Sequence, residues 1–257
     1  MGRNVRVSEP KIRIMRAAKK EFSERGFSGA RMSEIAKGAG VNKALIHYYF
    51  KDKETLYVEL LRRVFSGAGR ETEDTIPEFM GKWDLSPSQR LYVIIYIMSN
   101  IFLKATDPDI MRIFFWEMAE GTRYLDAMMQ EFTMPRQKII NDIVLEGIRS
   151  GEFETDFPKF AALNIGTFIS FYTIHRELHR GKPIFRELYG DASDQDVFQY
   201  VLESVFKSLK PKGKKLEIPR IPAEMKKNVD EMIEILIKNK DEGVTEEVVR
   251  VRTKQKQ

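Results

Sequence analysis

The segment with the clearest chemical potential is GVNKALIHYYFKDK, residues 40–53, which interleaves lysines with aromatic rings. In a helix, one face of this segment would carry Lys43, Ala44, His47 and Tyr48, and another face would carry Ile46, Tyr49 and Phe50. A helix that enters the major groove of DNA needs small or hydrogen-bonding side chains near its start and phosphate donors at its edges. The first face therefore predicts contact with DNA, and the second predicts packing in a core.

The preceding residues predict the elements that would position this helix. Residues 32–38, MSEIAKG, indicate a short helix, and AGV at 39–41 indicates a tight turn. Gly40 suits a backbone geometry that other residues resist, and Asn42 can cap the next helix by accepting from its free N–H groups. The order of helix, turn and helix predicts a helix-turn-helix motif.

Charge is distributed unevenly along the 257 residues. Residues 1–60 carry 13 Lys and Arg against 7 Asp and Glu, whereas residues 61–206 carry 16 against 22 and residues 207–257 carry 14 against 9. A basic N-terminal segment on an acidic body favours a module that binds a polyanion. The alternative on charge alone is that these basic side chains are simply solvated.

Composition narrows the class of protein further. The chain has no cysteine, which excludes a disulfide framework, a thiolate metal site and a cysteine nucleophile. The most apolar run, residues 91–103, is shorter than the roughly 20 residues that a bilayer requires. We therefore expect a cytoplasmic protein that does not associate with membranes and needs no cofactor.

Apolar residues recur at helical spacing nearly throughout, which predicts an all-α fold. Ser86-Pro87, Asp107-Pro108 and Asp156-Phe157-Pro158 carry helix-start signals. The expected helices span residues 10–25, 32–38, 43–50, 52–68, 87–105, 108–119, 122–150, 157–180, 194–209 and 223–240, with a shorter one near 245–252. The helix at 87–105 is apolar almost all round and is expected to be the central buried element.

Residues 14–57 contain a dense set of motifs, among them ERGF at 24–27, EIA at 34–36, AGV at 39–41 and YYF at 48–50. This segment resembles the TetR-type bacterial transcriptional regulators, and EGIRSGEF at 146–153 is similar to part of their ligand domain. The resemblance implies a homodimeric repressor that leaves its double-stranded DNA operator when a small-molecule effector binds.

The resemblance also implies a division of the chain. An N-terminal three-helix helix-turn-helix DNA-binding domain would span residues 1–55, and a larger helical ligand-binding and dimerisation domain would span residues 56–210. Residues 211–222 break the helical pattern with proline, glycine and lysine. A C-terminal extension, residues 211–257, would therefore follow, with an amphipathic helix that is expected to dock on the body.

Carried over to this sequence, the family's DNA contacts are expected at Arg31, Ser33, Asn42, Lys43, Ala44, Leu45, His47, Tyr48, Lys51 and Lys53. Lys43 and Ala44 would approach base edges, and Lys53 would hold a phosphate. Ala30 and Arg31 stand where the family commonly has threonine or serine, so the usual hydroxyl cap of the second helix is missing. Leu45 would either read a thymine methyl group or pack inward.

The helices of the body carry polar groups among aromatic and methionine side chains, as small-molecule sites often do. The expected ligand-binding residues are Tyr92, Tyr96, Asn100, Phe114, Glu117, Tyr124, Met128, Phe168 and Tyr172. The alternative for each of them is plain core. In that case the protein would be a regulator of the same fold that answers to a protein partner or to no effector.

Two later helices are too apolar for a monomer, which predicts that they pair with a second copy in a four-helix interface. Their stripes are Phe160, Leu163, Phe168, Phe171 and Ile174 in the first, and Val197, Phe198, Val201, Leu202, Val205, Phe206 and Leu209 in the second. With two copies, the operator is expected to be an inverted repeat.

His175 and His179 are spaced i, i+4, a pattern that binds zinc or nickel when a third ligand is present. No third ligand can be identified in the sequence, so solvent-facing histidines are the favoured interpretation and no metal is expected. The chain has no glycine-rich phosphate loop and no recognisable nucleophile motif. An all-α enzyme with an incidental helix-turn-helix is therefore the weaker alternative to a regulator.

Overall fold

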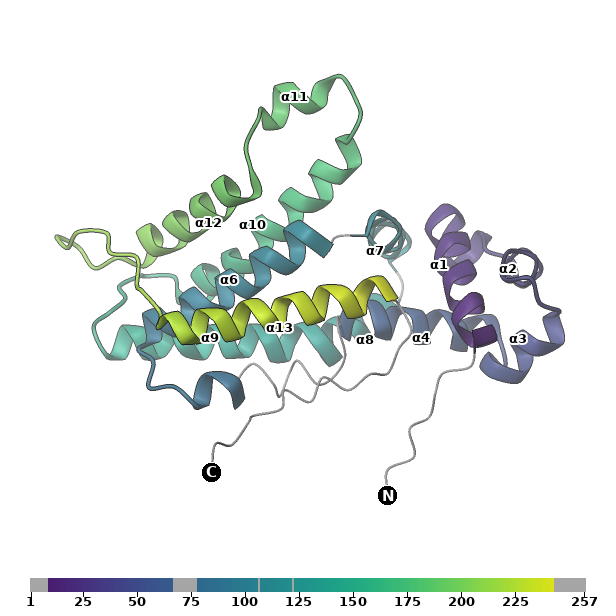
Figure 1. Ribbon diagram of the computed structural model, residues 1–257, viewed down its shortest axis with the longest axis horizontal. Coiled ribbons are helices and arrows are strands. Elements are labelled where there is room, and N and C mark those ends of the chain that lie inside the picture. Colours follow the sequence, from purple (N-terminus) through teal and green to yellow (C-terminus); the bar gives the residue numbers. More distant parts are fainter. Residues whose placement is uncertain (1–8, 67–77, 106, 122, 243–257) are drawn as a thin grey trace.

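The computed structural model describes residues 9–66, 78–105, 107–121 and 123–242, and every regular element in these ranges is helical (Figure 1). The helices are α1 (Glu9–Gly29), α2 (Met32–Ala39), α3 (Lys43–Phe50), α4 (Lys53–Ser66), α6 (Pro87–Ala105), α7 (Pro108–Glu120), α8 (Arg123–Met128), the π-helical turn η1 (Met129–Thr133), α9 (Met134–Arg149), α10 (Pro158–His179), α11 (Ile184–Tyr189), α12 (Asp194–Leu209) and α13 (Ala223–Glu242). The all-α prediction is confirmed. The helix expected near 245–252 lies outside the described residues.

The proline signals mark helix starts, as predicted. At the start of α6 the Ser86 N–H donates to Gln89 Oε1 over 3.1 Å, and the Gln89 N–H donates to Ser86 Oγ over 3.3 Å. This reciprocal pair is a capping box, which satisfies backbone donors that the first turn leaves free. Two features were not predicted: the short helix α11, and the π-helical turn that interrupts the long helix expected at 122–150.

Helices α1 to α4 form the N-terminal head. The turn between α2 and α3 places Gly40 at φ 63°, a left-handed conformation that glycine adopts without strain. The inner faces of the helices pack into a cluster that includes Ile14, Phe22, Ile35, Ile46, Phe50 and Leu56. The helix-turn-helix prediction is confirmed.

Helix α6 runs through the body that follows, and it contacts α9, α10, α12 and α13. Four of its side chains, Leu91, Val93, Ile95 and Ile97, are almost completely buried, which confirms its predicted central place. The apolar stripe of α12 from Val197 to Leu209 belongs to the same core. The expectation that this stripe forms a subunit interface is therefore wrong, because the same chain already covers it.

Helix α13 of the C-terminal extension docks on the body, as predicted. Figure 1 shows α13 lying along α6, and Met225, Val229, Met232 and Ile233 are buried there. At the edge of this contact the Tyr96 hydroxyl donates to Asp230 Oδ1 over 2.6 Å. No helix among the described residues has the length and apolar character needed to cross a membrane.

The head and the body share one core across the boundary expected near residue 55. Tyr57 of α4 is fully buried, and its ring lies 5.0 Å from Phe27 and 5.5 Å from Tyr124 between centroids. Three body residues complete this cluster: Ile113, Met128 and Phe132. A displacement of α7 or α8 would therefore be felt directly by the packing of α1 and α4.

Candidate nucleic-acid interface

The start of α3 is built to be presented to a ligand. Asn42 occupies the N-cap, and its side chain accepts from the Leu45 N–H over 2.8 Å, so the predicted cap is confirmed. A cap of this kind leaves the next residues in helical conformation from the first turn. Lys43 and Ala44 follow it directly, and both are exposed.

The aromatic residues of α3 divide between a buried face and an exposed face, as predicted. Ile46 and Phe50 are buried in the head, and Tyr49 is half-buried. His47 is exposed, and Tyr48 is the most exposed large apolar side chain of the described residues, at 79%. Tyr48 meets Tyr49 edge-on, with ring centroids 5.2 Å apart.

Leu45 is half-buried and thus contributes to both faces of α3. Lys51 follows the last residue of α3 and has a φ of 59°, a backbone conformation that residues other than glycine rarely adopt. His47 Nδ1 lies 2.6 Å from the Lys51 carbonyl oxygen, which ties the exposed histidine to this turn. The Lys51 side chain is exposed beside it.

The start of α2 lacks a hydroxyl cap, as predicted. Arg31 occupies the N-cap in extended conformation, and its side chain makes no capping hydrogen bond. Its backbone N–H donates to Glu21 Oε1 over 3.1 Å. The Arg31 side chain is exposed. Ser33, two residues later, is half-buried.

Lys53 has a structural role that the sequence did not suggest. Its ammonium donates to the carbonyl oxygens of Phe27 at 2.8 Å and Ala30 at 3.2 Å, and it lies 4.6 Å from the centre of the Phe27 ring. These contacts satisfy carbonyl groups at the end of α1. A phosphate contact by Lys53 stays a prediction, but Lys53→Ala would also loosen the head and does not test DNA binding alone.

Residues 14–60 match the family described as bacterial regulatory proteins, tetR family. The chain is also 26% identical over 205 residues to the HTH-type transcriptional regulator RutR of Escherichia coli (strain K12), an alignment that covers 77% of this chain and 92% of that protein. The N-terminal segment of this chain therefore matches the tetR family, and the comparisons support a DNA-binding transcriptional regulator of this type.

Solved structures agree with this fold. The crystal structure of HlyIIR, a hemolysin II transcriptional regulator, superposes with a TM-score of 0.55 at 23% identity, covering 80% of this chain and all of that one. The regulator FadR from Bacillus subtilis, solved in complex with stearoyl-CoA, superposes with a TM-score of 0.52 at 23% identity. That alignment covers 74% of this chain and 96% of FadR.

The residues expected to bind a ligand lie in three separate places. Tyr92, Tyr96 and Asn100 lie on α6 beside α12 and α13, and both tyrosine rings meet Phe198. Phe114, Glu117, Tyr124 and Met128 lie near the junction of head and body, where Met128 is buried in the shared core. Phe168 and Tyr172 stack on each other on α10. The structure thus does not bring the nine residues together in one pocket, and ligand binding by any of them stays a prediction.

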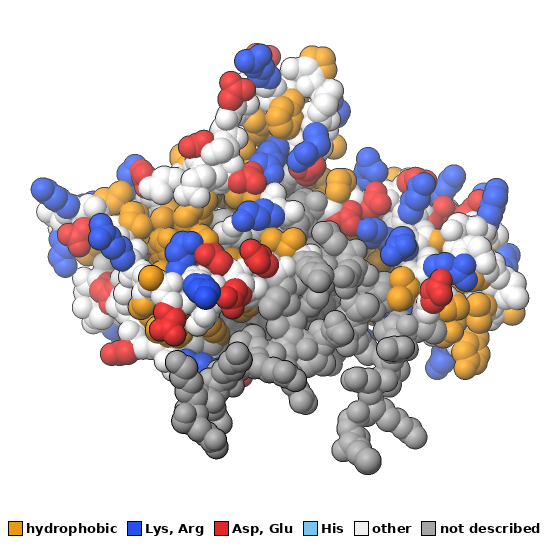
Figure 2. Space-filling model, in the orientation of Figure 1, with side chains coloured by type: hydrophobic (Ala, Val, Ile, Leu, Met, Phe, Trp, Pro, Cys, Tyr) orange, Lys and Arg blue, Asp and Glu red, His pale blue; other side chains and the backbone are white. Residues whose placement is uncertain are grey.

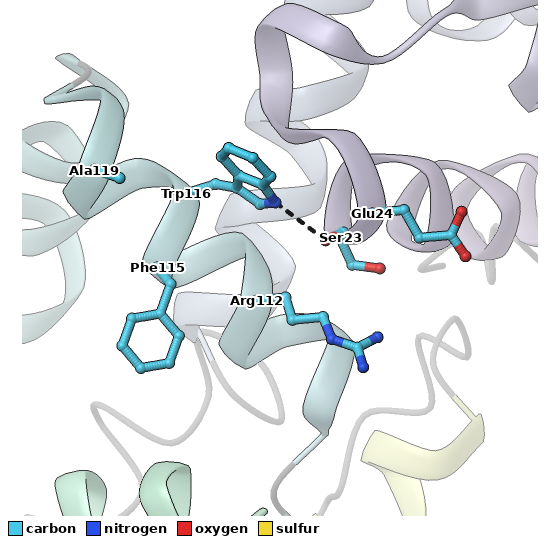
Figure 3. Close-up of a pocket in the computed structure, with 6 residues that line it drawn as sticks. All are labelled: Ser23, Glu24, Arg112, Phe115, Trp116 and Ala119. Carbon is cyan, nitrogen blue, oxygen red and sulfur yellow. Dashed lines mark hydrogen bonds between the residues drawn. The ribbon is translucent and has the colours of Figure 1, made fainter. Parts of the chain in front are cut away.

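Two surface grooves lie near these places. One, of about 570 Å³, lies between α6 and α13 and is lined by Tyr96, Asn100, Lys104, Asp230, Ile233, Glu234 and Ile237. The other, of about 510 Å³, lies between α1 and α7 (Figure 3). There Trp116 Nε1 donates to the Ser23 carbonyl oxygen over 3.1 Å, while the Phe115 ring points away from α1. The second groove follows the seam where head meets body.

A carboxyl group is buried at the junction of head and body. Glu117 is only 1% exposed, and its Oε1 accepts from the Tyr57 hydroxyl over 2.5 Å. Burial raises the pKa of Glu117 above its ordinary value of 4.5, and the nearby Glu120 adds to the rise, whereas the Tyr57 hydrogen bond opposes it. Burial and the same hydrogen bond also raise the pKa of Tyr57. Tyr57 is therefore the donor.

We expect Glu117→Gln to increase the free energy of unfolding at neutral pH. The pKa of Glu117 is raised in the folded state, so the protonated carboxyl group adds to the free energy of unfolding. This contribution is complete below pH 4.5 and is lost as the pH rises through the pKa of Glu117 in the folded protein. Glutamine keeps an oxygen that can accept from Tyr57 and carries no charge. Urea unfolding from pH 4 to pH 8 should show the variant gaining on the wild type as the pH rises. A stability difference that stays constant with pH would contradict this assignment.

Proposed function

We propose that this regulator is a homodimeric repressor whose two α3 helices enter the major groove of an inverted-repeat operator. A small-molecule effector bound to the body lowers its affinity for that operator. The observation that carries the proposal is the exposed face of α3, where a capped helix start presents Lys43, Ala44, His47 and Tyr48 to solvent. Small and hydrogen-bonding groups at such a start suit base edges, and the flanking Arg31 and Lys51 suit phosphates.

A second copy is supported by one apolar face of α10. Four of its large side chains are exposed at helical spacing: Phe160, Leu163, Phe171 and Leu178. Ile184 and Leu188 of α11 extend this face, and Figure 2 shows apolar side chains at the tip that carries α11. Contiguous exposed apolar surface of this kind marks an interface. A two-fold pair would place the recognition helices about 34 Å apart, one turn of the duplex, or somewhat farther.

The effector site that the geometry supports best is the groove between α6 and α13. It combines the apolar side chains of Ile233 and Ile237 with Tyr96, Asn100 and Lys104, so it suits a largely apolar molecule with a polar end. The relatives support an effector of this class: FadR was solved with stearoyl-CoA. The chain is also 27% identical, over 143 residues, to the fatty acid metabolism regulator protein of Bacillus subtilis (strain 168).

A second candidate is a regulator of the same fold that answers to a protein partner or to no effector. The separation of the expected ligand residues into three places favours it, because several of them are ordinary core. A variant truncated before α13 lacks one wall of the groove between α6 and α13. If an effector still released this variant from DNA, the effector site would lie elsewhere in the body.

The DNA-binding proposal is tested by titrating duplex DNA at two or more salt concentrations. Each neutralised phosphate contributes a slope of about −0.9 to the plot of log K against log salt concentration, so several contacts make binding fall steeply. We expect Lys43→Ala to weaken binding and to make the slope shallower by roughly one unit if Lys43 also meets a phosphate. Lys227→Ala, which changes an exposed lysine on α13, is the matched control. Equal affinities for wild type and Lys43→Ala at every salt concentration would refute the docking.

A further inference from the structure

Two histidines on α10 and a tyrosine on α11 bring three metal-binding atoms together, far along the chain from the DNA interface. His175 and His179 lie one helical turn apart, with ring centroids separated by 4.3 Å. The Tyr189 hydroxyl oxygen lies 2.5 Å from His175 Nδ1 and 3.5 Å from His179 Nδ1. Two imidazole nitrogens and a phenol oxygen therefore converge on one point, and Tyr189 is the third donor that could not be identified in the sequence.

We propose that His175, His179 and Tyr189 bind a divalent transition-metal ion, Zn²⁺ or Cu²⁺, within one subunit. Histidines spaced i, i+4 on a helix form a two-point chelate, and imidazole suits these metals. Zinc bonds of about 2.0–2.1 Å place neighbouring tetrahedral ligands roughly 3.3 Å apart. The 3.5 Å between Tyr189 and His179 suits such an ion, and the 2.5 Å between Tyr189 and His175 widens when the ion binds. Among the described residues no three His, Cys, Asp or Glu side chains form a metal site. The phenol is thus essential to the site, and water would complete it.

The surroundings hold these three rings in place. Phe171 stacks on His175 with centroids 5.7 Å apart, and Tyr172 meets Tyr189 edge-on at 5.7 Å. The nearest cation on α10, Arg176, donates to Asp194 Oδ1 over 2.7 Å, so its charge is balanced by that carboxylate.

Metal binding exchanges two hydrogen bonds for bonds to the ion. The bond between the Tyr189 hydroxyl and His175 Nδ1, at 2.5 Å, is given up, and the phenol proton passes to solvent as the oxygen binds. The bond between His179 Nδ1 and the His175 carbonyl oxygen, at 2.8 Å, is given up as well. The imidazole then carries its proton on Nε2, where solvent can accept a hydrogen bond. The ion would join α11 to α10, and binding to the folded state alone raises the stability of the protein.

The chain offers a clean background for the experiment, because it contains three histidines in total and no cysteine. Full-length protein is dialysed against a chelator and titrated with Zn²⁺ by calorimetry, and with Cu²⁺ by absorption spectroscopy. We expect one ion per chain, and loss of saturable binding in His175→Ala and in His179→Ala. His47→Ala is the matched control and should bind like the wild type.

Tyr189→Phe keeps the ring and removes only the oxygen, so it should fold normally and isolate the third donor. We expect its affinity for Zn²⁺ to fall by at least roughly 100-fold, because the loss of a group that only supports a metal ligand already costs about 10–100-fold. Circular dichroism confirms that each variant is folded. Binding in the folded His175→Ala variant that equals the wild type would overturn the site. Unchanged affinity in Tyr189→Phe would overturn the three-donor geometry.

Discussion

Gly147→Ala is expected to destabilise the protein by about 3 kcal/mol, at the upper end of the cost of overfilling a core. A Cβ atom at Gly147 would lie 2.0 Å from Cδ2 and 2.4 Å from Cε2 of the Phe153 ring. Phe153 is buried, and its N–H donates to the Gly147 carbonyl oxygen over 2.9 Å, so the ring cannot move aside without breaking the end of α9. Urea unfolding followed by circular dichroism measures the loss.

Gly166→Ala is the matched control, because it also adds a methyl group to a helical glycine. There the added Cβ would meet only the terminal methyl group of Met98, at 3.0 Å, which can turn away. Alanine is favoured over glycine in a helix by about 1 kcal/mol, so the control should be neutral or slightly more stable. If Gly147→Ala unfolded at the same urea concentration as the wild type, the ring of Phe153 would not lie across α9.

The double variant Phe160→Glu, Phe171→Glu should be a folded monomer with at least ~100-fold lower affinity for an inverted-repeat duplex, the scale by which two linked sites exceed one. The two rings are 69% and 61% exposed on the α10 face that is proposed to pair with a second copy. Carboxylates at these positions cannot be desolvated without a partner. Sedimentation gives the subunit number, and duplex titration gives the affinity.

Met134→Glu provides the comparison, because it places a carboxylate at an exposed apolar position on α9, outside that face. It should dimerise and bind duplex like the wild type. A double variant that sediments as a dimer and keeps its affinity would show that the subunits pair through another surface, or that a single subunit binds DNA.

Local patterns predicted most of the head. The residues that fix α2, the turn and α3 act on their immediate neighbours: Gly40 through its φ angle and Asn42 through the Leu45 N–H. The division of α3 into a buried face and an exposed face follows from helical periodicity alone. Lys53 was harder to interpret, because its two carbonyl partners lie 26 and 23 residues away in the chain.

The body depends on contacts that periodicity does not specify. The apolar stripe of α12 predicted burial correctly, but only tertiary packing shows that α6 and α10 of the same chain cover it. The predicted ligand residues lie in three places for the same reason, because aromatic residues at helical spacing do not reveal which helices will face one another. The sequence does not single out Tyr189 of α11, because only the folded connection from α10 to α11 brings its hydroxyl group next to His175.

The motif EGIRSGEF, residues 146–153, makes contacts that explain why these residue types occur together. Besides the contact of Gly147 with Phe153, the carboxylate of Glu152 accepts from the Ser88 N–H at 3.1 Å and from the Ser88 hydroxyl at 2.5 Å. Glu146 pairs with Arg90. The motif thus fastens the end of α9 to the start of α6, which is a structural role.

Selection of bound sequences from a random pool of duplex DNA would show whether two α3 helices bind one operator together. Two α3 helices related by a two-fold axis should enrich an inverted repeat whose half-sites are centred about one helical turn apart, ~34 Å, or somewhat farther. Recovery of unpaired half-sites, or no enrichment over the starting pool, would contradict the account of a symmetric pair that reads DNA through the exposed face of α3.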